Sequence, residues 1–467
     1  MTYLLFFKSE IEIERSDMEV QLQDRPLLVG GQYQASNGEY SWYYNPLGFG
    51  GVTVLDQQSQ LLLSLCDGQH TVQQIIQTDR RSDDEVAQDI QILGQREVVS
   101  ISDNFTKQLR GSIKRDNSFA CWMHLTNSCN LACSYCYIHK SPGDMKLSTG
   151  KLVIDKMIQT CKLHGVNNAS IKFAGGEPLT RFSLLKKLVN YSEKIRGNVE
   201  IGYVLLTNGT TINPVKAEYI ATHNINVAVS LDGVGEANDL NRYDKQGRGS
   251  YLNVIRGLEE LDKVGINPSI MTTISSSNMP HLVRLTELVL DKGYRFRFSL
   301  ERDTDSGQPS LLSKIPELIE TLHRCYDLVE QELPDKDFTS IHRFGDTNFN
   351  KPANKACGAG SNFFAVGHDG QVEACGIGLS NPFTNIFDMG DLIDDINTGN
   401  PVLSKHNVSN YDKCSNCIWR KSCAGSCPMQ TISTYGRIDH SSPYCEVYQQ
   451  ILPRVLRIKA LQMIRDQ

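Results

Sequence analysis

The sequence predicts an α/β protein built around a partial (β/α)6 barrel, with a smaller unit before the barrel and a cysteine-rich unit after it. Strand-like and helical patterns alternate six times between residues 119 and 310, as they do in parallel sheets covered by helices. Seven of the 14 cysteines lie beyond residue 350. A chain of 467 residues is also too long for one ordinary core, so several units are expected.

The composition describes a globular protein and excludes some classes of partner. Hydrophobic residues make up 40% and charged residues 21% of the chain, and the net charge is −6 without a basic run. Nucleic acid is therefore not expected as a partner, because phosphate binding leaves a lysine and arginine footprint. The apolar stretch 3–7 is too short for a membrane span, so we expect no membrane association and a cytoplasmic location.

The cysteines indicate metal ligands rather than disulfides. The chain is long, and most of its thiols are grouped at metal-ligand spacings. Four cysteines stand outside these groups in apolar surroundings, where inert buried thiols are expected. They are Cys66, Cys121, Cys161 and Cys325.

Residues 1–102 are expected to form a small unit of short paired strands and three short helices. The β-prone segments are 3–13, 26–30 and 40–55. A first helix is predicted over 56–66, and capping boxes begin the next two helices. The capping boxes are Thr71 with Gln74 and Ser82 with Glu85. Residues 103–118 are polar and rich in charge and are expected to form a linker.

Residues 119–310 carry the six strand–helix repeats. The predicted strands are 122–125, 170–173, 202–206, 226–231, 269–273 and 295–300. Helices such as 148–164 and 251–264 would cover the outer face of the parallel sheet. A helical and loop bridge over 311–350, with a helix at 311–330, then leads to the last unit, 351–467.

Three cysteines follow the first barrel strand: Cys129, Cys133 and Cys136, at C-x-x-x-C-x-x-C spacing. Three thiolates leave one iron of a four-iron cluster open, and that iron can bind the amino and carboxylate groups of S-adenosylmethionine (SAM). Chemistry in βα barrels is also found at the carboxyl ends of strands. A zinc knuckle is the alternative, but zinc needs a fourth ligand, and only His124 and His139 are close.

This motif is similar to that of the radical SAM superfamily, with Tyr135 in the aromatic place before the third cysteine. The resemblance implies a TIM-like barrel of the radical SAM type that binds a [4Fe-4S] cluster and SAM. GGEP after the second strand, TNG after the third and SLDG after the fourth fall where the family has its SAM contacts. The SAM contacts implied are Tyr135, Gly175, Gly176, Glu177, Pro178, Asn208, Ser230 and Arg242.

Two roles within these segments follow from chemistry. The glycines of GGEP would let the backbone approach the ligand, and the Glu177 carboxylate could accept from the SAM ammonium group. Arg242 and Arg248 could reach the SAM carboxylate, although a solvated loop arginine is the alternative for each.

The tail resembles the SPASM domain, a two-cluster extension of radical SAM enzymes that modify peptides and proteins. Its seven cysteines follow the pattern C-x12-G-x4-C, a gap, C-x2-C-x5-C-x3-C, a gap, and C. Two zinc sites are the alternative for paired C-x-x-C units. By resemblance, the tail would hold an outer and an inner auxiliary cluster, for three [4Fe-4S] clusters in the chain. The outer ligands would be Cys414, Cys417, Cys423 and Cys445, and the inner ligands Cys357, Cys375 and Cys427.

The inner set is one thiolate short of four. A substrate thiolate, a water molecule, or a side chain such as His342, Asp346 or His368 could complete it. Relatives that make formylglycine in sulfatases carry an Asp after the second SPASM cysteine. This chain has Gly376 there, which counts against that reaction.

The first unit resembles the PqqD-like precursor-recognition element of ribosomal peptide maturation. The resemblance lies in 54–65, in Cys66-Asp67-Gly68, and in 71–76 and 85–99. Such domains bind a leader peptide as an added strand of a small sheet. A winged-helix unit that only packs on the barrel is the alternative.

Together these resemblances imply a radical SAM oxidoreductase that modifies a ribosomally made precursor peptide bound by its leader. A deoxyadenosyl radical would abstract a hydrogen atom, and loss of a second electron to the auxiliary clusters would permit an intramolecular cross-link. A carbon–carbon link to an aromatic side chain is preferred over a thioether. An external one-electron reductant, flavodoxin- or ferredoxin-like, is expected. The alternatives are formylglycine-type or other oxidation without ring closure, and a non-catalytic electron carrier or peptide escort.

Overall fold

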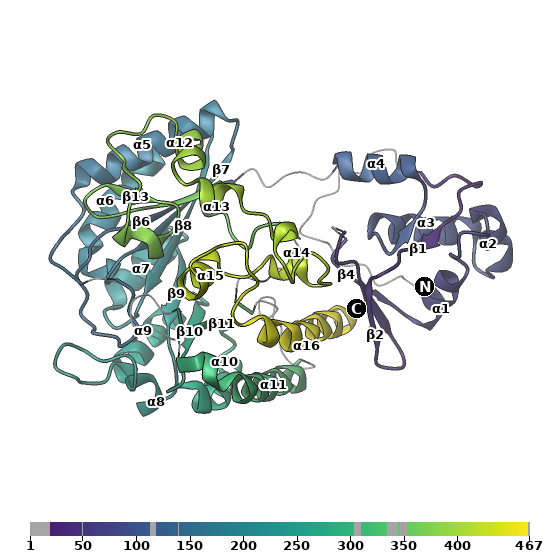
Figure 1. Ribbon diagram of the computed structural model, residues 1–467. Coiled ribbons are helices and arrows are strands. Elements are labelled where there is room, and N and C mark those ends of the chain that lie inside the picture. The colour runs from purple at the N-terminus through teal and green to yellow at the C-terminus, as the bar shows by residue number, and fades with distance from the viewer. Residues whose placement is uncertain are drawn as a thin grey trace.

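The computed structural model describes residues 19–48, 50–112, 118–138, 140–302, 310–333, 344–345, 347, 349 and 353–465. The predicted strand over 3–13 and the candidate ligands His139, His342 and Asp346 lie outside these residues. A front unit, a large sheet covered by helices and a cysteine-rich carboxyl-terminal region follow one another along the chain (Figure 1). None of the described helices is both long and apolar enough to span a membrane.

A nine-stranded sheet forms the centre of the molecule, in the order β11-β10-β9-β8-β7-β6-β12-β13-β14. The six strands β6 to β11 pair in parallel in sequence order, which confirms the predicted α/β class with a mostly parallel sheet. These strands are β6 (Ser118–His124), β7 (Asn168–Ala174), β8 (Glu200–Thr207), β9 (Asn226–Ser230), β10 (Ser269–Ile274) and β11 (Arg295–Leu300).

Helices connect the parallel strands and bury one apolar face each. In α9, Val254, Leu258 and Leu261 recur at helical spacing and are fully or almost fully buried. The helices that follow β6 to β11 in turn are α5 (Leu147–Leu163), α6 (Phe182–Ile195), α7 (Pro214–Thr222), α9 (Tyr251–Lys263), α10 (Leu282–Asp291) and α11 (Ile315–Glu332), with a short α8 (Glu236–Asp239) before α9.

Strand β6 divides its side chains between the two faces of the sheet. Phe119, Cys121 and Met123 are fully buried in the same core as helix α5. Because side chains alternate along a strand, Trp122 and His124 project from the opposite, inner face. Beyond β6 the sheet continues into the carboxyl-terminal region, since β12 (Phe363–Val366) pairs with β6 in parallel. This continuation was not expected from the sequence.

The front unit contains the predicted helices and capping boxes. Its sheet of β2 (Tyr33–Ser36), β3 (Ser41–Tyr44) and β4 (Val52–Leu55) precedes α1 (Gln57–Ser64), α2 (Val72–Thr78) and α3 (Asp83–Gln95), and β1 (Leu27–Leu28) pairs with β5 (Val99–Ser100). Both capping boxes are present, which confirms those two helix starts. The segment expected as a linker begins with helix α4 (Asp103–Ser112), whose Phe105 and Leu109 are buried in the core of the front unit.

The front sheet packs on the carboxyl-terminal helix α16 (Cys445–Arg465), which lies between the barrel and the front unit in Figure 1. Trp42 and Tyr44 belong to the main core rather than to the core of the front unit. The Arg457 guanidinium lies over the Trp42 ring, 5.6 Å from its centroid, and the Tyr44 hydroxyl hydrogen-bonds that of Ser422. The front unit is therefore anchored beside the cysteine-rich region.

The remaining elements of the carboxyl-terminal region are short. They are β13 (Gln371–Glu373), β14 (Thr384–Asn385), α12 (Leu392–Gly399), α13 (Pro401–Lys405), α14 (Arg420–Cys423) and α15 (Pro428–Tyr435).

Candidate active site

The loop with Cys129, Cys133 and Cys136 starts just after β6 and is pinned by the segment that follows β9. The Ala132 amide donates to the Tyr243 carbonyl at 2.7 Å, and the Ser134 amide to the Asn241 carbonyl at 3.1 Å. Backbone hydrogen bonds of this kind hold a cysteine loop in shape without any help from its side chains. The three thiols therefore sit on a fixed support at the carboxyl edge of the sheet.

Gly175 and Gly176 allow a close approach of two backbones at this edge. A Cβ atom at Gly176 would lie 2.1 Å from the Ser128 carbonyl oxygen, and one at Gly175 would lie 2.4 Å from the Thr126 oxygen. Gly175 also has a φ of 123°, which favours glycine. The sequence predicted that these glycines admit the ligand. In the structure their close neighbour is the backbone of the cysteine loop.

Glu177 ties the ends of β7 and β8 together. Its side chain is fully buried and accepts hydrogen bonds from the Thr207 hydroxyl and the Asn208 amide, both at 2.8 Å, and from the Leu179 amide at 2.9 Å. Burial raises the pKa of the Glu177 carboxyl, and these donors oppose that rise. The carboxylate is thus occupied by protein donors, and its predicted contact with the SAM ammonium group remains a prediction. Pro178 follows as the first residue of a short 3-10 helix.

Asn208 places a polar side chain against the first cysteine. Its amide nitrogen donates to the Asn130 side-chain oxygen at 2.9 Å and lies 3.8 Å from Cys129 Sγ. The Leu131 amide also donates to Cys129 Sγ, at 3.4 Å. Burial raises the pKa of the Cys129 thiol to about 11, so a metal must displace its proton.

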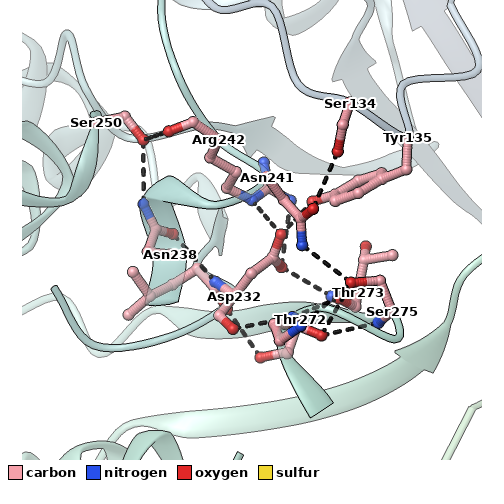
Figure 2. Close-up of polar contacts among 12 residues, drawn as sticks. Ser134, Tyr135, Asp232, Asn238, Asn241, Arg242, Ser250, Thr272, Thr273 and Ser275 are labelled. Atoms are coloured by element: carbon pink, nitrogen blue, oxygen red, sulfur yellow. Dashed lines mark hydrogen bonds and ion pairs between the residues drawn. The ribbon is translucent and has the colours of Figure 1, made fainter. Parts of the chain in front are cut away.

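A polar network around Asp232 holds the loop from the other side (Figure 2). The Asp232 carboxylate accepts from Arg242 Nε at 2.7 Å, from the Thr273 amide at 2.9 Å and from the Tyr135 hydroxyl. The Arg242 guanidinium lies over the Tyr135 ring, 5.4 Å from its centroid. Burial lowers the pKa of Arg242, but the charge and hydrogen bond of Asp232, together with the effects of Tyr135 and Cys133, raise it above its usual value.

Sequence reasoning assigned Arg242, Tyr135 and Ser230 to SAM and did not single out Asp232. The structure brings Arg242 and Tyr135 together on Asp232, whereas Ser230 stands half-buried at the end of β9. The signal for Asp232 was its position in the SLDG segment. Arg248 fits the alternative to a SAM contact, a solvated loop arginine, because its side chain is 76% exposed and pairs with Asp244.

The structure groups four of the tail cysteines. Cys414, Cys417, Cys423 and Cys445 line one cavity in the carboxyl-terminal region, together with Trp419. These are the four cysteines predicted for the outer cluster. Cys423 lies in α14, Cys445 begins α16, and the other two cysteines lie in the loop between α13 and α14.

The three cysteines predicted for the inner cluster have different surroundings. Cys357 is exposed, Cys375 half-buried and Cys427 buried. Burial raises the pKa of the Tyr137 phenol, and the charges of Cys375 and Cys136 add to this rise. Tyr137 is therefore near one barrel cysteine and one tail cysteine. The candidate ligand His368 lies near His124 and beside Gly143, at the other end of β13 from Cys375.

The donor set fits an iron–sulfur cluster better than a zinc ion. In the described part of the chain, only His164, Asp391 and Asp394 form a His, Cys, Asp or Glu group of three within 4.8 Å. The barrel thiols are therefore more widely spaced than ligands at about 2.3 Å from one zinc. The four cysteines predicted to be inert, Cys66, Cys121, Cys161 and Cys325, are all buried, as expected.

Three thiols at the carboxyl edge of a mostly parallel sheet fit the class of enzymes that bind an iron–sulfur cluster with an open iron. The pattern of the Radical SAM superfamily matches residues 123–289. An uncharacterized protein of Methanocaldococcus jannaschii is 33% identical over 204 residues, which cover 43% of this chain and 69% of that protein. The chain belongs to the radical SAM superfamily, and it is a radical SAM enzyme of the oxidoreductase type. The superfamily implies one [4Fe-4S] cluster and SAM.

Longer matches extend beyond the barrel. A cysteine-type anaerobic sulfatase-maturating enzyme of Clostridium novyi is 25% identical over 352 residues, which cover 70% of this chain and 92% of that protein. The structure of anSMEcpe with bound AdoMet shares the fold, with a TM-score of 0.62 and 22% identity, over 73% of this chain and 98% of that one. Streptococcus suis SuiB bound to S-adenosylmethionine has a TM-score of 0.52 and 17% identity, over 90% of this chain and all of that one.

Proposed function

We propose that the protein oxidatively modifies a ribosomally made precursor peptide and forms an intramolecular cross-link in it. The product would be a carbon–carbon link to an aromatic side chain or, second, a thioether. The observation that carries the proposal is the approach of the tail to strand β6, which leads into the cysteine loop. Strand β12 pairs with β6, and a Cβ atom at Gly376, next to Cys375, would lie 3.2 Å from the Trp122 indole. A tail cysteine next to this contact supports an internal electron acceptor near the barrel cysteines.

The residues have distinct roles in this proposal. Cys129, Cys133 and Cys136 would hold the cluster that binds SAM, and seven tail cysteines would hold two auxiliary clusters. When bound, these groups supply one-electron chemistry, namely hydrogen-atom abstraction from the peptide and acceptance of a second electron. The Asp232 network and the GGEP segment hold the cysteine loop in place.

The peptide class is supported by the front unit, which we propose to be a PqqD-like leader-recognition domain. SuiB, which shares the fold over 90% of this chain, has also been solved bound to precursor peptide SuiA. Strand β2 ends the three-stranded front sheet and is only partly buried, so its edge could accept an added strand. An external one-electron reductant, flavodoxin- or ferredoxin-like, completes the proposal.

Formylglycine-type oxidation is the second candidate, because sulfatase-maturating enzymes are among the relatives. A Cβ atom at Gly376 would already lie 3.2 Å from the Trp122 indole. An aspartate at this position would therefore need Trp122 to move. Gly376 avoids this contact, and the sulfatase type of site would need a small shift of the indole.

The test is incubation of the anaerobically reconstituted protein with SAM, a reductant and a peptide encoded beside its gene. A cross-linked peptide loses two hydrogens and keeps all its other atoms, whereas formylglycine formation from cysteine also removes sulfur. Release of deoxyadenosine without any change in peptide mass would contradict the proposal.

A further inference from the structure

Two buried polar atoms on the inner face of β6 have no hydrogen-bond partner among the described residues. They are Trp122 Nε1 and His124 Nε2. The two side chains leave the strand on the same face, and their ring centroids are 6.2 Å apart. Buried polar atoms without a partner are rare in folded proteins, and they mark places where water or a ligand supplies the missing bond.

The pair lies between the two cysteine groups of the proposed function. His124 ends the strand that leads into the loop of Cys129. A Cβ atom at Gly376, the neighbour of Cys375, would lie 3.3 Å from Trp122 Nε1. The Phe363 ring closes a further side of Trp122, with centroids 6.5 Å apart. The pair therefore lies between the end of β6, which leads to the cysteine loop, and the tail residue next to Cys375.

Two buried acidic groups at this edge of the sheet are already occupied. Asp232 accepts from Arg242, Tyr135 and Thr273, and Glu177 accepts from three donors of its own. A ligand could use these carboxylates only by breaking existing bonds. Trp122 and His124 can bind a ligand without that loss.

The chemistry of the two rings selects the ligand. An indole nitrogen only donates, so the ligand must present an acceptor oxygen to Trp122. Burial, with a smaller effect of His368, lowers the pKa of His124 to about 4, so the imidazole is neutral and carries one donor and one acceptor nitrogen. A peptide amide group offers a carbonyl oxygen and an N–H together.

We propose that Trp122 and His124 bind a main-chain amide of the substrate peptide inside the barrel, with Trp122 donating to its carbonyl oxygen. This inference rests on the proposed function for its substrate class. The two side chains would hold the peptide backbone next to the cysteine loop whatever the neighbouring side chains are. They act as substrate-contacting residues.

The test uses N-acetylglycine N-methylamide, a probe with two amide groups and no side chain. Its binding to the reconstituted holoenzyme is measured by saturation-transfer NMR. Trp122→Phe and His124→Phe should each raise the Kd for the probe roughly three- to tenfold, as expected for one lost hydrogen bond. His124→Gln, which keeps a donor and an acceptor, should recover part of the affinity.

The chain offers matched controls. Trp42 Nε1 and His406 Nε2 are also buried and without a hydrogen-bond partner in the described structure, but they lie in the front sheet and the carboxyl-terminal region. Trp42→Phe and His406→Phe should leave the Kd for the probe unchanged. Thermal unfolding of all five variants shows which of them fold like the wild type.

The outcomes separate this inference from the proposed function. Unchanged probe binding in folded Trp122→Phe and His124→Phe, or equal weakening in the controls, would mean that water alone satisfies the two atoms, and the inference falls. If wild-type protein binds the probe through Trp122 but modifies no peptide, the proposed function falls and the amide site stands.

Discussion

Asp232 shows how one carboxylate organises the candidate site. It is fully buried and joins three parts of the chain: the cysteine loop through Tyr135, the segment after β9 through Arg242, and β10 through Thr273. These contacts tie the cysteine loop to two neighbouring segments of the barrel.

Replacement of Asp232 by Asn should lower the free energy of unfolding by about 3–5 kcal/mol, because Arg242 would remain charged and buried without its counter-ion. Denaturant unfolding of the anaerobic protein measures this loss. Asp244→Asn is the control, since Asp244 pairs with the largely exposed Arg248 and its replacement should lower the free energy of unfolding far less. Equal losses in the two variants would show that burial of the Asp232 pair has no special effect.

Gly176 should not tolerate a side chain. Gly176→Ala would place a methyl group 2.1 Å from the Ser128 carbonyl oxygen, so the cysteine loop must move away from β7. We expect iron content and the rate of deoxyadenosine release to fall together. Gly30→Ala is the control, because no atom lies within 4 Å of its Cβ position, and it should keep both values. Full iron content in Gly176→Ala would contradict this interpretation of the glycine.

At the scale of elements, local patterns predicted the six parallel strands but missed the pairing between segments that are far apart in the sequence. Strand β11 has the predicted bounds, whereas β6 starts four residues before the predicted position at 122. Strand β12 is short, and its residue Ala365 pairs with Trp122 of β6. The two residues are far apart in the sequence, so no local periodicity reveals this pairing. Helix α16 has 21 residues although Pro453 lies inside it. Because proline usually breaks a helix, the sequence does not indicate one continuous helix here.

The front sheet and α16 should behave as one element. Trp42→Ala removes a fully buried ring that packs under Arg457, which should cost about 3–5 kcal/mol and loosen α16. Hydrogen exchange of 445–465 should therefore speed up. Ile90→Ala is the control, since it opens a cavity in the separate core of the front unit and should leave exchange in α16 slow. Equal exchange in both variants would mean that the sheet does not support α16.

At the scale of the whole molecule, sequence spacing predicted which cysteines lie together better than it predicted the neighbours of the other candidate residues. The cysteines assigned to the outer cluster do line one cavity. The direction of the Glu177 carboxylate, and the surface that Gly176 approaches, depend on how β7 meets the cysteine loop. Trp122 attracted no attention in the sequence, because an unpartnered indole nitrogen becomes visible only once its surroundings are known.

The barrel and tail sites should load iron independently. Cys129, Cys133 and Cys136 lie on a loop held by backbone hydrogen bonds and by the Asp232 network, whereas the four outer cysteines line a separate cavity. Replacing the three barrel cysteines by Ala should abolish deoxyadenosine release and leave about eight irons per chain. Iron analysis and the assay for deoxyadenosine measure the two effects. Cys161→Ala, which removes a buried thiol outside these groups, should keep all the iron and the activity. Loss of all iron in the triple variant would show that the tail clusters depend on the barrel site.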